Sequence, residues 1–147
     1  MEWAGVLPGV VALLLLCLLA VLVWPFIRRH LLSRHGTVFD CELNLVTSGE
    51  PQWQLGLARC AGDQLEWFPR HGVRLQPAYT LSRTASGGIR AQTRTTDPDG
   101  LNGQRIVRLE PLGGSATVWE LALGEDPLTA LLAWLEAAPP SIGRFRS

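Results

Sequence analysis

Few residues of this chain combine the type and the spacing that metal or nucleophilic chemistry requires. The histidines His30, His35 and His71 lack the H-E-x-x-H spacing that places two imidazoles on one helix face around zinc. The sequence contains no G-x-S-x-G motif, in which a sharp turn exposes a nucleophilic serine. It also contains no lysine, which excludes a Schiff base and a P-loop lysine. We therefore expect no catalytic residue, no metal site and no enzyme activity.

Two further motifs point to turns rather than to ligand sites. The stretch Asp97–Gly100 resembles the start of a calcium loop, but the twelfth position of that loop is Arg108 instead of a bidentate acid. The glycine pairs at 87–88 and 113–114 precede no convincing helix, so they predict hairpin turns rather than phosphate cradles. We expect no cofactor.

Arginine is the residue type that points to an interaction. Between Arg70 and Arg94 the chain has five arginines and no acid. A face of this kind, held near an anionic leaflet, attracts lipid headgroups at about 1 kcal/mol per basic residue. The alternative is a solvated strand face balanced by acids elsewhere. The residues predicted to contact lipid or a partner are Arg28, Arg29, Arg34, Arg83, Arg90 and Arg94.

Nucleic acid is not an expected partner of these arginines. The formal net charge of the chain is zero, and no basic sheet interleaved with aromatic residues is evident. Lipid headgroups and a membrane protein complex therefore remain the expected partners.

A long apolar run places these residues at a membrane. Trp3–Ile27 contains no charged side chain. As a helix it spans roughly 37 Å, enough for a hydrocarbon core of about 30 Å. Trp3 and Trp24 mark its two ends, where aromatic rings favour the membrane–water boundary. Pro8 and Pro25 lie near the ends, where a helix tolerates proline better than in its middle. The run predicts a transmembrane anchor over residues 1–30.

A secretory signal peptide is the competing interpretation of this run. It requires a basic segment before a shorter apolar core and a small-residue cleavage site after it. Here Glu2 precedes the run, and the basic residues Arg28 and Arg29 follow it. Basic flanks stay on the cytoplasmic side. We expect a retained anchor in the cell membrane, with the N-terminus outside and the C-terminal domain in the cytoplasm.

The remaining chain is long enough for one domain. We assign residues 31–36 to a basic juxtamembrane linker, residues 37–140 to the domain and residues 141–147 to a flexible tail. Cys41 and Cys60 are expected to be reduced and buried in strands; an outward-facing domain would instead allow them to form a disulfide.

Alternating apolar residues and turn residues predict a mainly-β domain. Gly62-Asp63, for example, separates two such runs as a compact hairpin signal. About seven strands result, which indicates a small barrel or sandwich. The predicted strands are Thr37–Val46, Trp53–Ala61, Gln64–Phe68, Tyr79–Ala85, Ile89–Thr95, Gln104–Leu112 and Thr117–Leu123.

One amphipathic helix follows the strands. Asp126 is the predicted N-cap and Pro127 the first helical residue. Leucines at i, i+3, i+4 and i+7 define its apolar face, and Trp134 beside them is expected to pack against the domain. Seven antiparallel strands followed by a C-terminal amphipathic helix form the order of a pleckstrin-homology-like (PH-like) barrel. The four leucines are Leu128, Leu131, Leu132 and Leu135.

The whole pattern resembles a known family. A span ending in Arg-Arg precedes Gly36–Cys41, then Trp53–Arg59 and Leu65–Phe68, and the chain closes on Ala133–Pro140. Together these segments resemble an actinobacterial family of single-pass membrane proteins known as domain of unknown function 2550. The resemblance implies a cell-membrane protein of an actinobacterium. It implies no catalytic residue.

These observations favour a membrane-anchored binding or scaffolding module. Its cytoplasmic domain would contact a membrane-complex partner or anionic lipid headgroups. Two alternatives stay open: an exported domain, either secreted or anchored on the outer face, and an enzyme without a recognisable motif.

Overall fold

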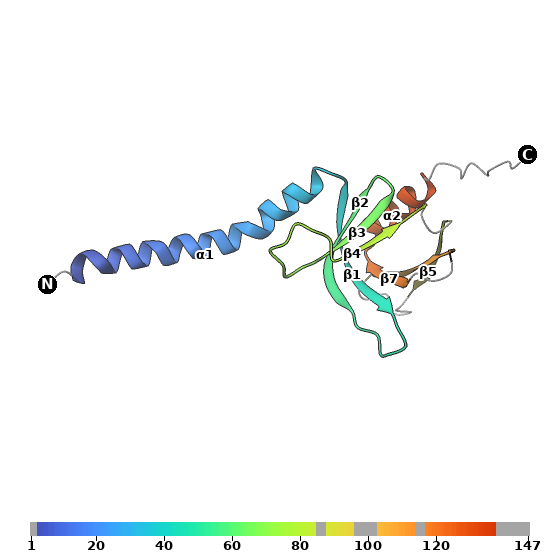
Figure 1. Cartoon of the computed structure of the whole chain (residues 1–147), viewed down its shortest axis with the longest axis horizontal. Helices are drawn as coiled ribbons and strands as arrows, with labels where there is room; N and C mark the ends of the chain where they lie inside the picture. Colours follow the sequence, from blue (N-terminus) through green and yellow to red (C-terminus); the bar gives the residue numbers. More distant parts are fainter. Residues whose placement is uncertain (1–2, 85–87, 96–102, 114–116, 138–147) are drawn as a thin grey trace, which may run out of the picture. The chain divides into compact units, whose positions relative to one another are not determined.

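The computed structural model describes residues 3–84, 88–95, 103–113 and 117–137 (Figure 1). The chain forms two compact units, the first ending at His35 and the second beginning at Gly36. The predicted tail over residues 141–147 and the predicted turn at Asp97–Gly100 lie outside the described residues.

The first unit is the helix α1, Trp3–Ser33. An 18-residue window within Gly5–Ser33 has a mean hydropathy of 3.1, so by length and composition this helix can cross a membrane. Pro8 and Pro25 lie within the helix, as their positions near its ends predicted. The helix continues through residues 31–33, which the sequence had assigned to the linker. An N-terminal helix compatible with a single-pass membrane anchor is therefore part of the structure.

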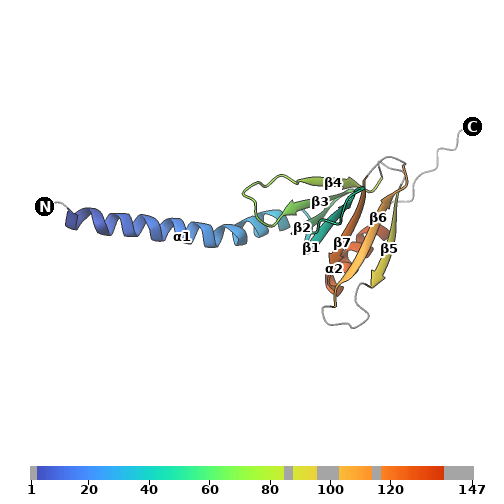
Figure 2. The same cartoon turned by 90° about the horizontal axis from the view of Figure 1, so that it is seen from below.

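The second unit contains one curled antiparallel sheet of seven strands, in the order β4-β3-β2-β1-β7-β6-β5 (Figures 1 and 2). The sheet is a half-barrel, because among the described residues β4 and β5 are its two unpaired edges. This arrangement confirms the predicted mainly-β, PH-like fold. The strands are β1 Thr37–Val46, β2 Gln54–Ala61, β3 Gln64–Pro69, β4 Tyr79–Ser82, β5 Ile89–Thr95, β6 Arg105–Pro111 and β7 Val118–Leu123.

The alternating sequence explains the inner face of the sheet. Successive side chains of a strand point to opposite faces, so every second residue reaches the core. On β1 these residues are Phe39, Cys41 and Leu43, all buried. The register sets Leu43 opposite Leu121 of β7 and Phe39 opposite Ala58 of β2. Burial of such side chains, at roughly 1.5–3 kcal/mol each, favours this register over a one-residue slip.

The helix α2, Glu125–Glu136, covers this core. Leu128 and Leu131 are buried, while Leu132 and Leu135 pack partly buried against the core cluster. Trp134 also packs there, as predicted. The prediction of Asp126 as N-cap was wrong, because the helix begins earlier.

Gly124 is the N-cap of α2, and its carbonyl oxygen accepts the first bond, from Leu128 N at 3.0 Å. Pro127 is consequently the third helical residue. Its missing N–H costs nothing there, since the first N–H groups of a helix have no partner within the helix.

The predicted strand Tyr79–Ala85 was too long, because β4 ends at Ser82. The backbone N of Arg83 donates to the carbonyl oxygen of Asp63 at 2.8 Å, and Thr84 N donates to the Asp63 carboxylate at 3.3 Å. The first bond still follows the β3–β4 register, whereas the second goes to a side chain, so the chain leaves β3 at Thr84. The bounds of the other strands differ from the predictions by at most one residue at either end.

Candidate functional site

Arg83 is held inside the domain. Its Nε lies 3.3 Å from Asp63 Oδ1, its Nη1 donates to the carbonyl oxygen of Trp134, and its guanidinium lies 4.8 Å from the centre of the Trp134 ring. The side chain is only 11% exposed. Because the indole Nε1 of Trp134 also donates to Gly62 O at 2.9 Å, this cluster joins α2 to the β2–β3 hairpin.

Asp63 is the acceptor at the centre of that cluster. Its carboxylate accepts bonds from the Thr84 hydroxyl, from Ser82 Oγ at 3.1 Å and from Arg83. These bonds, led by that from Thr84, hold the pKa of Asp63 below its usual range. The turn that carries it is the predicted one, since Gly62 has φ 56°, a left-handed conformation that glycine adopts without strain. Arg83 thus has a structural role in this cluster.

Arg90 and Arg94 lie on the outer face of β5. Both are exposed, and no ion pair or hydrogen bond of either is found within the described parts of the chain. Arg108, on the neighbouring strand β6, instead donates from Nε to Glu110 at 2.7 Å and from Nη1 to Glu120 at 3.3 Å. The Glu110 bond raises the pKa of Arg108 further. Glu110 of β6 and Glu120 of β7 are therefore engaged by Arg108.

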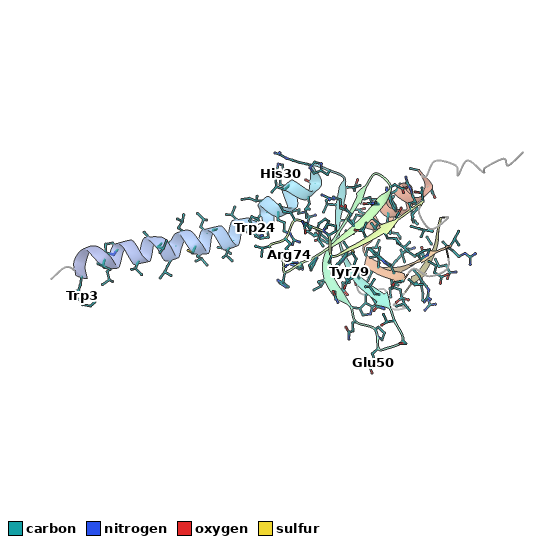
Figure 3. The ribbon with its side chains drawn as sticks, in the orientation of Figure 1. Trp3, Trp24, His30, Glu50, Arg74 and Tyr79 are labelled. Carbon is teal, nitrogen blue, oxygen red and sulfur yellow. The ribbon has the colours of Figure 1, made fainter. Side chains whose placement is uncertain are left out.

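The β3–β4 loop, residues 70–78, combines exposed apolar and basic side chains that the sequence analysis did not select. Val73 is 74% exposed and Leu75 44% exposed, with the exposed Arg74 between them (Figure 3). Both ends of the loop are fixed to the sheet: Arg70 N donates to Leu55 O at 3.0 Å, and Ala78 N to Trp67 O at 2.8 Å. The sequence does contain a pattern that could have predicted this loop. A basic residue stands between two apolar ones, in a segment bounded by residues that interrupt strands: Pro69, Gly72 and Pro77.

The remaining predicted contacts, Arg28, Arg29 and Arg34, belong to the first unit. Arg28 and Arg29 lie in the last turns of α1, and Arg34 follows its end. The structure thus distributes the six selected arginines over three places: the end of α1, the Arg83–Asp63–Trp134 cluster and the outer face of β5. In the second unit, the β3–β4 loop and β5 lie on opposite sides of the half-barrel (Figures 1 and 2).

The domain thiols have no reactive character. Cys41 and Cys60 are buried and free. Burial, joined for Cys41 by the neighbouring Asp40 carboxylate, raises the pKa of each thiol to about 12. Cys60 pairs with Thr37, four residues from Cys41 along β1, so the two Cα atoms are too far apart for a disulfide, which needs them within about 7 Å. The disulfide alternative is therefore excluded in this fold.

The cavities of the described domain are small. One of about 160 Å³ is lined by Glu50 and Tyr79, both labelled in Figure 3, together with residues of β1 and β2. Its walls mix apolar and uncharged polar side chains around one carboxylate, without a nucleophile beside a base. Among the described residues, no group of three His, Cys, Asp or Glu side chains could hold a metal ion. The lining residues are Leu43, Leu45, Thr47, Glu50, Gln52, Gln54 and Tyr79.

Comparison with known proteins connects this architecture to uncharacterised relatives. The family model described as "Protein of unknown function (DUF2550)" matches residues 14–141. Two relatives from Mycobacterium tuberculosis are similar to this chain: "Uncharacterized protein MT1352" of strain CDC 1551 and "Uncharacterized protein Rv1312" of strain H37Rv. Each is 28% identical over 142 residues, which cover 95% of both chains. The match extends through the apolar helix and the half-barrel together.

Proposed function

This chain belongs to the DUF2550 family of proteins of unknown function, and from that premise we propose that it is a membrane-anchored, non-catalytic binding module whose half-barrel contacts anionic lipid through the β3–β4 loop. The observation that supports the proposal most directly is the exposure of Val73 and Leu75 beside Arg74.

Covalent connection keeps the domain near the lipid surface. Only residues 28–36 separate the apolar run from the first residue of β1, Thr37. Even fully extended, the ten residue steps from Ile27 to Thr37 reach at most about 35 Å. A loop on a domain tethered at this distance meets the surface at a high effective concentration, so a weak contact suffices for binding.

The loop has the chemistry of an interfacial contact. Val73 and Leu75 can enter the boundary between headgroups and acyl chains, and full burial of such a side chain contributes roughly 1.5–3 kcal/mol. Arg74 would then lie at the headgroups, where a basic residue contributes about 1 kcal/mol on an anionic leaflet. Since the loop ends are bonded to the sheet, the tip is presented at a low cost in conformational entropy.

We place the domain on the cytoplasmic side of the cell membrane. The basic residues Arg28, Arg29 and Arg34 flank the apolar run on its C-terminal side, and short basic flanks resist translocation. The cytoplasmic leaflet is also the anionic one, which agrees with the charge of the loop.

A fluorophore in the loop tests this contact. The full chain, with Cys17→Ser and Gln76→Cys and an environment-sensitive dye on Cys at position 76, is reconstituted into vesicles of neutral or anionic lipid. The native Cys41 and Cys60 are buried and react little. We expect a blue shift of the dye in anionic vesicles that weakens with salt and is reduced by Arg74→Glu and by Val73→Ser with Leu75→Ser.

Ser48→Cys supplies the control, because Ser48 is exposed in the β1–β2 loop, which has no arginine. A dye there should not respond to lipid charge. Identical spectra for both labelled positions in every lipid would rule out the loop as the membrane contact.

A further inference from the structure

The edge strand β5 presents hydrogen-bonding groups that no other described strand satisfies. β5 pairs with β6 on one side only. Leu112 N donates to Gly88 O at 3.0 Å, so the backbone of residue 88 faces β6. In an antiparallel ladder this direction alternates. Hence Arg90, Gln92 and Arg94 direct their backbone groups at β6, whereas Ile89, Ala91 and Thr93 direct theirs at the open edge.

Among the described residues, the side chains around this edge leave room for another strand. Residues 90–94 are all exposed, including Ala91 and Thr93, whose cross-strand partners Leu109 and Val107 are buried in the core. Ile89 is partly buried against the core cluster. A strand added beside β5 would therefore extend the half-barrel and set every second side chain over its apolar interior.

The basic side chains on the outer face of β5 favour an added strand with acidic side chains on that face. Arg90, Gln92 and Arg94 point outward, and Arg108 already engages Glu110 and Glu120. In the register centred on Gln92, a second copy of β5 is a poor occupant. Antiparallel pairing centred on Gln92 would set Arg90 of each copy opposite Arg94 of the other, and like charges directly opposite each other are destabilising.

We propose that the β5 edge binds an extended segment of a partner protein in which acidic residues alternate with apolar ones, as an eighth strand of the sheet. Its backbone would bond to Ile89, Ala91 and Thr93, its acidic side chains would lie beside Arg90 and Arg94, and its apolar side chains would face the interior. This surface is separate from the β3–β4 loop, so the proposal does not depend on lipid binding.

Two peptides test the charge of the occupant on the full chain in neutral nanodiscs. One is a labelled seven-residue peptide alternating Glu and Val, and the other alternates Lys and Val. We expect the acidic peptide to bind about tenfold more tightly, because two cross-strand charge pairs change from attractive to repulsive. Arg90→Glu with Arg94→Glu should reverse this preference. Equal binding of both peptides would overturn the proposal and leave the arginines as charges that merely protect an edge.

A proline variant locates the binding. Ala91→Pro removes an N–H that faces the open edge and leaves the β6 ladder intact, since proline is tolerated on the free side of an edge strand. We expect this variant to keep the circular dichroism of the parent and to lose the acidic peptide. Full binding by folded Ala91→Pro would assign the peptide to another surface. Crosslinks between two chains through Thr93→Cys would assign the edge to a second copy instead.

Discussion

Gly56 shows how one residue controls the packing of the half-barrel. It lies on the inner face of β2, opposite Cys41 of β1 and Pro69 of β3. A Cβ at this position would lie 2.5 Å from Cε2 and Cζ2 of Trp67, and closer still to the carbonyl oxygen of Phe68. Trp67 is fully buried. The absence of a side chain at residue 56 therefore creates the space that the Trp67 indole fills.

Gly56→Ala should destabilise the domain by about 1–3 kcal/mol, the usual cost of adding a carbon to a filled core. Chemical denaturation followed by tryptophan fluorescence measures this loss. Gly49→Ala is the matched control, because a Cβ on Gly49 meets no atom within 4 Å. Equal unfolding midpoints for the two variants would contradict the packing assigned to Trp67.

At the scale of elements, the β2–β3 hairpin and α2 are joined through Asp63, Arg83 and Trp134. The register that sets Gln64 opposite Ser82 brings Arg83 to Asp63, 20 residues earlier in the chain, and to Trp134, 51 residues later. Contacts between residues so far apart in the chain cannot be predicted from a short window of sequence. For this reason the sequence predicted that Arg83 contacts lipid or a partner, although its guanidinium is bound to Asp63 and Trp134 within the domain.

The lowered pKa of Asp63 predicts a pH-dependent stability. A carboxyl whose folded pKa lies below its unfolded value, about 3.9, stabilises the fold above that value. This contribution is lost as the pH falls through the folded pKa. Asp63→Asn should therefore lower the melting temperature at pH near 7, and the difference from the parent should shrink on acidification below about pH 4.

Thermal unfolding across this pH range, followed by near-ultraviolet circular dichroism, measures the effect. Glu50→Gln is the control, since Glu50 is an exposed loop carboxyl. A constant difference between Asp63→Asn and the parent at every pH would argue that the hydrogen bonds of Asp63 do not depend on its charge.

At the scale of the whole molecule, the chain consists of an apolar helix and a half-barrel joined by a short link. α1 has the length and composition of a membrane span. The side of the membrane on which the half-barrel lies decides whether its basic loop meets an anionic leaflet. The direction of insertion is therefore the property on which the proposed lipid contact depends most.

Reporter fusions at the C-terminus test this direction. We expect a green fluorescent protein fusion to fluoresce and an alkaline phosphatase fusion to be inactive, because short basic flanks resist translocation. Replacing Arg28, Arg29 and Arg34 together by alanine should raise the phosphatase activity. An active phosphatase on the unaltered chain would instead support an exported domain.

Local patterns accounted for most of the fold. The uncharged run predicted α1, and alternation with turn residues located seven strands to within a residue at nearly every end. Both signals arise from neighbouring residues, because a helix or a strand exposes its periodicity in a short window. One error arose from a distant group, because the Asp63 side chain binds Thr84 beyond the end of β4. The other was a local shift of two residues, from Asp126 to Gly124, in the N-cap of α2.

Local patterns in the sequence were enough to predict an apolar helix, an alternating β domain and a surplus of arginine near its middle. The folded domain was needed to show which arginines are engaged within it and which remain on its surface. The physical reason is that ion pairs and sheet edges depend on register and strand order. Arg83 meets Asp63 through the β3–β4 register, whereas Arg90 and Arg94 remain at an edge because β5 is last in the sheet.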